Sequence, residues 1–354
     1  MMKIDEIKIS KTNHSKINDV DFDNIKFGHE FSDHMLSIDF DGSEWKNAEV
    51  VPYGEFLISP ANLALHYGQS IFEGLKAYRL KDGSINLFRA KDNLNRLNKS
   101  ARRMCMAEID ADLALSSLKT LLDVDREWIP QKDGSSLYIR PFMFATDPTL
   151  GVKASDTYKY LVITGPVNAY YAAPVSVKIE SHYTRAVSGG VGAAKTAGNY
   201  AASLKPAREA AAQGFDQIVW TDGQTHKYIE ESGTMNIAFI INGTLVTPAL
   251  SDSILPGITR DSVLTVAKDW GMKVEERKVS ITEIREAIEN KSLNEAFGMG
   301  TAATIARIKS IGFDDKTLSL PTFNDDDFSV KVMNYLDDIK YGRTEDKFGW
   351  VENF

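Results

Sequence analysis

The sequence contains a single cysteine, Cys105, among 354 residues. One thiol excludes an internal disulfide and a metal site built from clustered cysteines, and it is typical of a reducing compartment. We expect Cys105 itself to be a small buried side chain on a helix. Apolar runs long enough to cross a membrane as a helix are also missing. The sequence therefore indicates neither a disulfide-rich secreted protein nor a helical membrane protein.

A basic excess is missing as well. The chain has 41 lysines and arginines against 49 aspartates and glutamates, which gives a net charge of -8. Because a phosphate-binding surface requires positive charge, nucleic acid is not expected as a partner. Asp5 and Glu6 occupy the region that is apolar in a signal peptide, and no arginine precedes Arg79. Neither secretory nor mitochondrial targeting is therefore expected, and the predicted location is the cytoplasm.

The length of the chain predicts two domains, because one hydrophobic core usually serves at most about 250 to 300 residues. With 43% hydrophobic and 25% charged residues, the composition is that of an ordinary globular protein. Strand-like and helical segments both occur and no internal repeat is apparent, so the predicted fold class is α+β with two α/β domains. A stretch without any period marks the linker. The predicted boundaries are a small domain at 1–165 with a lead-in arm at 1–30, a linker at 166–176, and a large domain at 177–354.

One helical pattern is clear in the first half of the chain, with Asp92 as its N-cap. Its apolar stripe has spacings of three and four, and its members are Leu94, Leu97, Ala101 and Met104. At about 100° per residue, Arg96 lies about 160° around this helix from Leu94. Composition alone therefore predicts that Arg96 is a solvated helix arginine.

Residues 136–144 alternate like a strand, which places Tyr138 and Arg140 on the same face. A tyrosine hydroxyl and a forked guanidinium that project together can hold a carboxylate. The same pattern also describes the solvent-facing side of an ordinary strand. Both interpretations remain open at this point.

The second half has clearer turn and cap signals. A helix is expected over 200–213, broken or restarted at Pro206, and another from Pro256 to Trp270. Asn242-Gly243 predicts a hairpin turn, and Ser280 with Glu283 resembles a capping box. A turn rich in glycine and alanine is expected over 297–303.

The stretch Ser188-Gly-Gly-Val-Gly-Ala-Ala-Lys-Thr-Ala-Gly-Asn-Tyr200 surrounds Lys195 with residues that have almost no side chain. Three interpretations compete. The first is a flexible loop with a solvated lysine. The second is phosphate binding, although Ala194 stands where a P-loop needs its second glycine. The third is a Schiff-base lysine whose desolvated amine attacks an aldehyde.

Several motifs in chain order resemble those of the branched-chain amino acid aminotransferases, which are pyridoxal-phosphate enzymes of fold type IV. The matching blocks are His66-Tyr-Gly-Gln-Ser-Ile-Phe-Glu-Gly74, Leu137-Tyr-Ile-Arg-Pro141, Gly189-Gly-Val-Gly-Ala-Ala-Lys-Thr-Ala-Gly-Asn-Tyr200, Glu230-Glu-Ser-Gly-Thr-Met-Asn236, Leu255-Pro-Gly-Ile-Thr-Arg260 and Phe297-Gly-Met-Gly-Thr-Ala-Ala303. Each block alone is weak, but together they are specific over about residues 50 to 310. The resemblance implies the two-domain architecture of a fold type IV aminotransferase.

The resemblance also implies a cofactor, pyridoxal 5′-phosphate, and a set of residues that bind it. Lys195 would bind the cofactor aldehyde and then move the proton from the substrate Cα. Glu231 would face the pyridine nitrogen, and Tyr200 would bond the phenolic oxygen of the ring. The phosphate would be held by the backbone N–H groups at a helix N-terminus together with two side chains; these residues are Ile258, Thr259, Thr301 and Arg96. For Arg96, the family role opposes the solvated position that composition predicts. No metal is implied.

The implied reaction is reversible transamination of L-leucine, L-isoleucine and L-valine with 2-oxoglutarate. In the family pattern, the residues around the bound amino acid are Tyr67, Phe72, Tyr138, Arg140, Val152, Tyr170, Thr234 and Ala302. An aromatic box accepts a branched apolar side chain, while tyrosine hydroxyls and Arg140 accept the side-chain carboxylate of glutamate. Val152 reaches the site of the partner subunit in the family, which implies a homodimer.

Other functions remain as alternatives. D-amino acid aminotransferase and aminodeoxychorismate lyase share the lysine and the glutamate, and they differ in the substrate box. A P-loop nucleotide hydrolase would use Asp222 as its metal-binding acid, but the second glycine of the motif is missing. Some animal members of the family carry a redox-active Cys-x-x-Cys where this chain has Ala303 and Ala306, so a thiol switch at that position is excluded.

Overall fold

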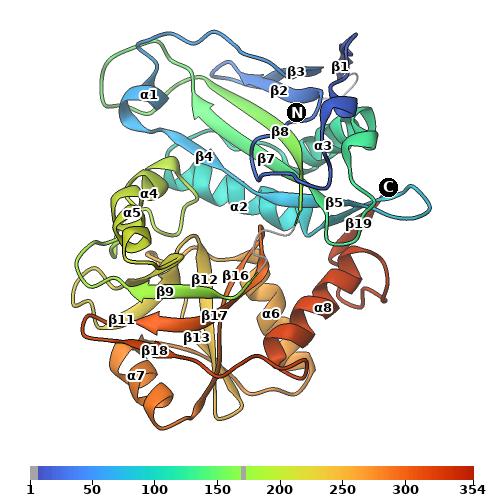
Figure 1. Ribbon diagram of the computed structural model, residues 1–354. Helices are drawn as coiled ribbons and strands as arrows, with labels where there is room; N and C mark the ends of the chain where they lie inside the picture. The colour runs from blue at the N-terminus through green and yellow to red at the C-terminus, as the bar shows by residue number, and fades with distance from the viewer. Residues whose placement is uncertain (1–6, 169–172) are drawn as a thin grey trace. The chain divides into compact units, whose positions relative to one another are not determined.

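The computed structural model describes the chain except for residues 1–6 and 169–172 (Figure 1). The chain divides into two compact units. The first comprises Met1–Tyr170, Ala194–Ala197 and Asp338–Phe354, and the second comprises Tyr171–Ala193 and Gly198–Asp337. Lys195 therefore groups with the first unit, although the residues on both sides of its short segment group with the second.

The first unit is built on a mixed sheet. In order across the sheet, its strands among the described residues are β1 (Lys8–Ile9), β3 (Trp45–Pro52), β2 (His34–Phe40), β8 (Tyr158–Val167), β7 (Ser136–Ala145), β5 (Leu75–Arg79), β6 (Ile85–Phe88) and β19 (Val351–Asn353), and β4 (Ser70–Phe72) pairs with β7. Every neighbouring pair is antiparallel except β1 with β3. The long β7–β8 pair forms the centre of the sheet, in register from Ser136 with Val167 to Ala145 with Tyr158.

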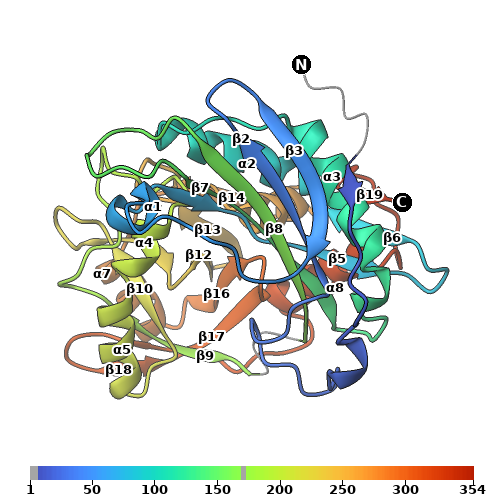
Figure 2. The ribbon, with the colours of Figure 1, turned by 90° about the horizontal axis from the view of Figure 1, so that it is seen from above.

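Two long helices cover one face of this sheet, as Figures 1 and 2 show from two directions. They are α2 (Ala90–Arg103) and α3 (Ala111–Val124), and the short helices are α1 (Leu63–Tyr67), η1 (Ile17–Asp19) and η2 (Arg126–Trp128). Leu94 and Leu97 of α2 are fully buried in the same core as Leu36 and Val50 of the sheet. The apolar stripe predicted for the first helix is therefore confirmed.

The C-terminal segment belongs to the first unit. Strand β19 pairs with β6 at the sheet edge, and Asn86 Nδ2 donates to the carbonyl oxygen of Lys340 at 2.9 Å. The sequence analysis placed all of 177–354 in the second domain, so Asp338–Phe354 differs from that expectation. The difference arises from a pairing between residues far apart in the chain, which local patterns do not encode.

The second unit contains another mixed sheet. Its described strands run in the order β14 (Val274–Arg277), β13 (Thr244–Pro248), β12 (Met235–Ile241), β16 (Leu293–Gly300), β17 (Thr304–Gly312), β9 (Val175–Ile179), β10 (Gln217–Thr221), β11 (Tyr228–Ser232) and β15 (Val279–Ser280), with β18 (Thr317–Ser319) on β17. The helices are α4 (Ala197–Ala201), α5 (Leu204–Ala212), α6 (Ile258–Asp269), α7 (Ile281–Glu289) and α8 (Phe328–Lys340), of which the first residue of α4 and the last three of α8 group with the first unit.

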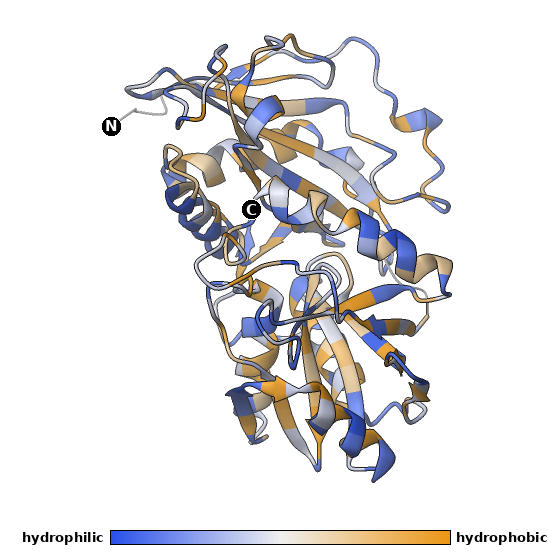
Figure 3. Cartoon of the chain, turned by 90° about the vertical axis from the view of Figure 1, so that its left-hand side faces the viewer, coloured by the Kyte–Doolittle hydropathy of each residue, from blue (hydrophilic) through white to orange (hydrophobic). Residues whose placement is uncertain are grey.

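An additional pairing makes this sheet fold back on itself. Strand β11 pairs with β10 and also with β12, which lies elsewhere along the strand order. Hydrophobic residues are frequent along the strands, whereas the helices carry both hydrophobic and hydrophilic residues (Figure 3). Phe239 and Phe297 on neighbouring strands are fully buried.

Several local predictions for the second half are confirmed. Ile241 and Thr244 pair across the Asn242-Gly243 turn, and the Ser280 side chain caps α7 by accepting from the Glu283 N–H. Helix α6 ends at Asp269, with Gly271 just beyond at a φ of 76°. Among the described residues, no helix combines the length and apolar character needed to cross a bilayer.

Three local predictions are wrong. Helix α2 begins at Ala90 with Arg89 as its N-cap, and Asp92 lies in its first turn, where it accepts from Arg89 Nε at 2.6 Å. Cys105 is exposed and follows the helix in a left-handed conformation with a φ of 53°, so it is not a buried helix residue. Strand β16 continues through Gly300, so the turn predicted over 297–303 is shorter than expected.

Phe239→Ala tests the importance of the core of the second unit. The side chain is fully buried, so truncation leaves a cavity and we expect the free energy of unfolding to fall by about 3–5 kcal/mol. Leu250→Ala is the control, because Leu250 is 47% exposed and its truncation should change that free energy by less than about 0.5 kcal/mol. Urea denaturation followed by circular dichroism measures both. Equal effects would contradict the assignment of Phe239 to the core.

Candidate functional site

The backbone around Lys195 is held within the first unit by several hydrogen bonds. Its N–H donates to Ser100 Oγ of α2 at 2.9 Å, and its carbonyl oxygen accepts from the Phe72 N–H at 3.0 Å. The next residue, Thr196, donates its hydroxyl to the carbonyl oxygen of Ser70 at 2.8 Å. The segment therefore adds to β4 as a short strand-like contact. This geometry fixes where the lysine side chain begins and does not fit a loosely attached loop.

The Lys195 side chain is partly buried and lies beside an aromatic ring. Its Nζ is 4.8 Å from the ring centroid of Phe72. Arg140 lies on the same ring, with its guanidinium carbon 4.6 Å from the centroid. Arg140 also donates from Nη2 to the Tyr138 hydroxyl at 2.8 Å. The structure thus brings together Phe72, Tyr138, Arg140 and Lys195, a cationic and aromatic group suited to an anionic substrate.

Arg96 is buried rather than solvated, so the interpretation from composition alone is wrong. Its Nε and Nη2 donate to the two carboxylate oxygens of Glu73, each at 2.8 Å. The side chains are 7% and 0% exposed. Such a bidentate pair holds the guanidinium in one orientation, and breaking it would leave an uncompensated buried charge. The helix periodicity could not reveal Glu73, which lies 23 residues away in the sequence.

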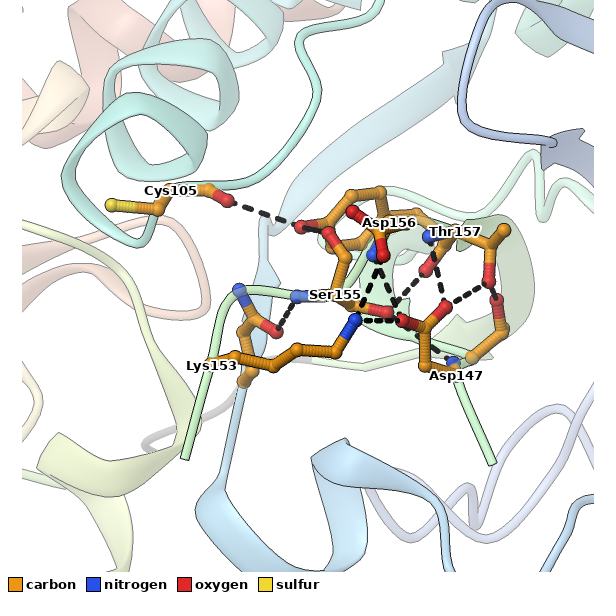
Figure 4. A network of polar contacts seen from close by, with 9 residues as sticks. Cys105, Asp147, Lys153, Ser155, Asp156 and Thr157 are labelled. Atoms are coloured by element: carbon orange, nitrogen blue, oxygen red, sulfur yellow. Dashed lines mark hydrogen bonds and ion pairs between the residues drawn. The ribbon is translucent and has the colours of Figure 1, made fainter. Parts of the chain in front are cut away.

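Val152 lies in the loop between β7 and β8, and its side chain is 89% exposed. The loop is anchored by Asp147, which accepts from the N–H groups of Asp156 and Thr157 at 3.0 and 3.1 Å (Figure 4). Lys153 Nζ lies 3.0 Å from the same carboxylate. Burial opposes ionisation of Asp147, but these donors outweigh it and hold its pKa well below the usual range. An exposed apolar side chain is therefore carried on a well-anchored loop.

Within the second unit, Glu231 lies on β11 and is 3% exposed. Its Oε1 accepts from the Leu255 N–H at 2.7 Å and from Asn236 Nδ2 at 3.2 Å. Its Oε2 lies 2.9 Å from Arg185 Nε. A buried carboxylate is costly unless it is paired and hydrogen-bonded, and here both oxygens have partners. The arrangement presents one carboxyl group in a fixed position.

Arg185 connects Glu231 to the segment before the lysine. Its Nη2 donates to the carbonyl oxygen of Gly192 at 3.3 Å and to that of Ser253. A side chain at Gly192 would not fit, because its Cβ would lie 2.5 Å from the Ser253 carbonyl oxygen and 2.6 Å from Ala186 Cβ. The glycine is therefore required for close packing within the second unit, and flexibility does not explain it.

The N-terminus of α6 carries Ile258 and Thr259, after Gly257 as an N-cap without a side chain. Backbone N–H groups at such a terminus attract anions. Thr301 and Ala302 lie in the turn of the β16–β17 hairpin, which Gly300 and Thr304 close.

The remaining predicted residues are placed as follows. Tyr200 lies on α4 and is partly buried. Thr234 is exposed in the turn between β11 and β12, and Tyr67 ends α1 with 44% of its surface exposed. Tyr170 lies outside the described residues. No cluster of potential metal ligands occurs among the residues that the structure describes.

Sequence reasoning did not identify Glu73, Arg185 and Asn236, which contact predicted site residues directly. Glu73 and Asn236 lie inside the motif blocks, but a motif does not say which side chain contacts which. Arg185 lies outside every block. Its only sequence signal is a cation close to the lysine loop, and that signal is weak.

Comparison with known proteins gives a consistent result. The family model for class IV amino-transferases matches residues 70–311. The chain is 46% identical to branched-chain-amino-acid aminotransferase 2 of Bacillus subtilis, over 92% of this chain and 91% of that protein. It is 48% identical to a probable branched-chain-amino-acid aminotransferase of Staphylococcus aureus, over 92% of both chains.

Solved structures agree with the sequence comparison. A branched-chain aminotransferase from Thermoproteus uzoniensis, solved with norvaline, superposes with a TM-score of 0.76 at 25% identity, covering 90% of this chain and 99% of that one. A branched-chain amino acid aminotransferase from Escherichia coli gives a TM-score of 0.73 at 27% identity, covering 90% of this chain and 98% of that one.

Glu230→Gln tests the charge state of the glutamate next to Glu231. Burial raises the pKa of Glu230 above its ordinary value of 4.5, and the Ser253 hydroxyl only partly offsets this effect. The folded chain therefore binds this proton more tightly than the unfolded chain, so the stabilisation is complete below pH 4.5 and is lost as the pH rises through the folded pKa. The neutral amide avoids this loss. We expect Glu230→Gln to become more stable relative to wild type as the pH rises.

Urea denaturation at a series of values from about pH 4 to about pH 8 measures this difference. Glu286→Gln is the matched control, because Glu286 is exposed on α7. A difference between wild type and Glu230→Gln that stays constant over this range would contradict the assignment.

Proposed function

The chain belongs to the class IV aminotransferase family, and from this membership we propose that it transfers amino groups between branched-chain L-amino acids and 2-oxo acids. The carrying observation is an identity of 46–48% to branched-chain aminotransferases over 92% of the chain, together with Lys195 in its matching motif. The cofactor is pyridoxal 5′-phosphate, consistent with a related branched-chain aminotransferase solved with pyridoxamine 5′-phosphate. We further propose 2-oxoglutarate as the acceptor, with L-glutamate as its product.

The described residues fit this cofactor. Three kinds of group are available to it: the amine of Lys195 on a fixed backbone, the buried carboxylate of Glu231, and the helix N-terminus at Ile258 and Thr259. A protonated pyridine nitrogen requires an anion, and a phosphate requires N–H donors and cations. When bound, the cofactor supplies an electron-withdrawing ring that stabilises negative charge on the substrate carbon.

We assign roles to the protein groups on this basis. Lys195 would hold the cofactor through its side-chain amine and would move the proton at the substrate Cα. Glu231 keeps the ring nitrogen protonated, and Arg185 keeps Glu231 paired. Tyr200 bonds the phenolic oxygen of the ring. The N–H groups of Ile258 and Thr259 would hold the phosphate, with Thr301 and Arg96 as further ligands, and Glu73 orients the guanidinium of Arg96.

The substrate residues form two groups by chemistry. Arg140 and Tyr138 bind the side-chain carboxylate of glutamate, because the hydroxyl and the guanidinium already lie together. Phe72 and Tyr67 contact the branched apolar side chain of the other substrate. Tyr170, Thr234 and Ala302 complete the proposed substrate site. This division explains how one site accepts both an anionic and an apolar side chain.

We also propose a homodimer in the cytoplasm. The β7–β8 loop supports the dimer, because its anchored backbone leaves Leu150 and Val152 exposed at 67% and 89%. Exposed apolar side chains on an ordered loop favour contact with another protein surface. In this proposal Val152 contributes to the substrate site of the partner subunit.

Alternative functions are less well supported. D-amino acid aminotransferase and aminodeoxychorismate lyase would share Lys195 and Glu231, but the relatives with high identity are named for branched-chain substrates. A P-loop nucleotide hydrolase has no support, because the family that the chain belongs to is that of the class IV aminotransferases. Its proposed metal ligand, Asp222, instead accepts from the N–H groups of Thr225 and Tyr228 at 2.7 and 3.0 Å in a turn.

Lys195→Ala tests the cofactor assignment. The purified wild type should show a visible absorbance band that shifts when leucine is added, whereas Lys195→Ala should lack the band. We expect turnover of leucine to fall by at least about 10²-fold, the usual contribution of a positioned proton-transfer group. Lys205→Ala is the control, because Lys205 is an exposed lysine whose ion pair is with Glu209. A band that survives Lys195→Ala would contradict the assignment.

Substrate comparison tests the specificity. Aminodeoxychorismate should give no pyruvate. Initial rates with L-leucine, L-isoleucine and L-valine against 2-oxoglutarate should exceed the rate with D-alanine by at least about tenfold. Such a ratio corresponds to about 1.4 kcal/mol of discrimination in the transition state. Preference for D-alanine would move the protein to another branch of the family.

Val152→Asp tests the dimer. Because Val152 is 89% exposed, we expect the variant to have an unchanged unfolding midpoint. Light scattering should show that the wild type is a dimer. In the variant, KM for leucine should rise about tenfold, equivalent to about 1.4 kcal/mol. Leu250→Asp, which alters another exposed apolar residue, is the control. A wild type that is monomeric at assay concentrations would refute this proposal.

A further inference from the structure

Asn236 occupies a buried position next to Glu231 that no part of the proposed mechanism uses. The two residues are direct partners across the β11–β12 pair, and Asn236 is only 5% exposed. Buried amides require partners for their donors. Asn236 Nδ2 supplies two hydrogens, one to Glu231 Oε1 at 3.2 Å and one to the Leu255 carbonyl oxygen at 2.9 Å.

Leu255 closes this set of bonds from the other side. Its N–H donates to the same oxygen of Glu231 at 2.7 Å. The N–H of Leu255 is therefore bonded directly to the carboxylate of Glu231, and its carbonyl oxygen is connected to that carboxylate through Asn236. Leu255 lies three residues before Ile258, the first residue of α6. The backbone entering the helix is thus tied to the position of the Glu231 carboxylate.

The close approach of Asn236 to the start of α6 gives a second, independent sign of the same connection. A Cβ added at Gly257, the N-cap of α6, would lie 1.9 Å from Asn236 Oδ1. Only glycine leaves room for the amide at this distance. The chemistry also fixes the orientation of the amide, because the nitrogen faces two acceptors, a carboxylate and a carbonyl, and only a donor can satisfy both.

We propose that Asn236 is a positioning residue that holds the carboxylate of Glu231 and the first turn of α6 in one geometry. This inference rests on the proposed function, in which Glu231 faces the ring nitrogen of the cofactor and α6 binds its phosphate. A rigid ligand with a charge at each end is bound best when its two protein partners keep a constant separation. Asn236 provides that constraint from within one unit of the chain.

Two substitutions separate this role from simple packing. Asn236→Leu keeps a side chain of similar size and removes both donated hydrogen bonds. Asn236→Asp keeps the shape and places a carboxylate oxygen about 3.2 Å from Glu231. Two carboxylates at that distance share a proton, since both cannot remain ionised without strong repulsion. The protonated form can donate an O–H to Glu231 and restore the lost contact.

The measurement is the dissociation constant of pyridoxal 5′-phosphate from the apo protein, by absorbance and fluorescence titration. For Asn236→Leu we expect the constant to rise about tenfold or more, as for loss of a hydrogen bond to a charged group. Pyridoxal lacks the phosphate that α6 is proposed to bind, so its binding does not depend on the position of α6. The dissociation constant of pyridoxal should therefore rise less than that of pyridoxal 5′-phosphate. For Asn236→Asp the defect relative to wild type should diminish as the pH falls, a response that altered packing does not produce.

Thr247→Val is the matched control. Thr247 is fully buried on β13, and its hydroxyl donates to the Ile237 carbonyl oxygen on β12 at 2.7 Å. The change removes one buried hydrogen bond between β13 and β12, the strand that carries Asn236, without touching Glu231. We expect a lower unfolding midpoint and an unchanged dissociation constant. Circular dichroism on every variant confirms folding, and Asn236→Asp, which preserves shape, carries the test if Asn236→Leu does not fold.

The outcomes separate this inference from the proposed function. If wild type binds the cofactor and converts leucine while Asn236→Leu binds with the wild-type constant, or if the Asn236→Asp defect is independent of pH, the role of Asn236 is refuted and the function stands. If wild type neither binds pyridoxal 5′-phosphate nor converts leucine, the proposed function itself fails.

Discussion

The buried carboxylate of Glu231 is the constraint on which the second unit depends. A charged group at 3% exposure must be paired and hydrogen-bonded, because its desolvation is otherwise too costly. Its partners Arg185, Asn236 and Leu255 come from three separate parts of the chain. The β11–β12 pairing, the segment before the lysine and the entry to α6 therefore converge on one side chain, and the extra pairing that folds the sheet back on itself brings two of them together.

The first unit also contains a buried ion pair, formed by Arg96 and Glu73, whose side chains are 7% and 0% exposed. Apolar side chains of similar volume often stabilise a core as well as a buried ion pair does. Stability alone therefore does not explain two Glu–Arg pairs, one in each unit. In the proposed function each pair contains one cofactor ligand, Arg96 or Glu231, and the partner fixes its orientation. Function explains the pairs better than folding energy does.

Local patterns in the sequence predicted what depends on neighbouring residues. The Asn242-Gly243 turn, the Ser280 cap and the apolar stripe of α2 were all found, because turn, cap and periodicity involve residues within a few positions. Arg96 shows where this approach fails, since its burial depends on Glu73 from another element. Motif resemblance predicted the family, which the comparisons support, but it gave roles only to single residues. The contacts of Arg185 and Asn236 required coordinates.

The two adjacent glutamates on β11 show why coordinates were needed. Sequence gives Glu230 and Glu231 the same chemistry, yet their surroundings differ. Glu231 has a guanidinium and a backbone N–H beside it, whereas Glu230 has the Ser253 hydroxyl, and burial raises its pKa. Ser253 also accepts from Arg185 through its carbonyl oxygen, so a single arginine links both environments. A negative charge at Glu230 would also interact with that arginine, and burial, by raising the pKa of Glu230, opposes the formation of this second charge.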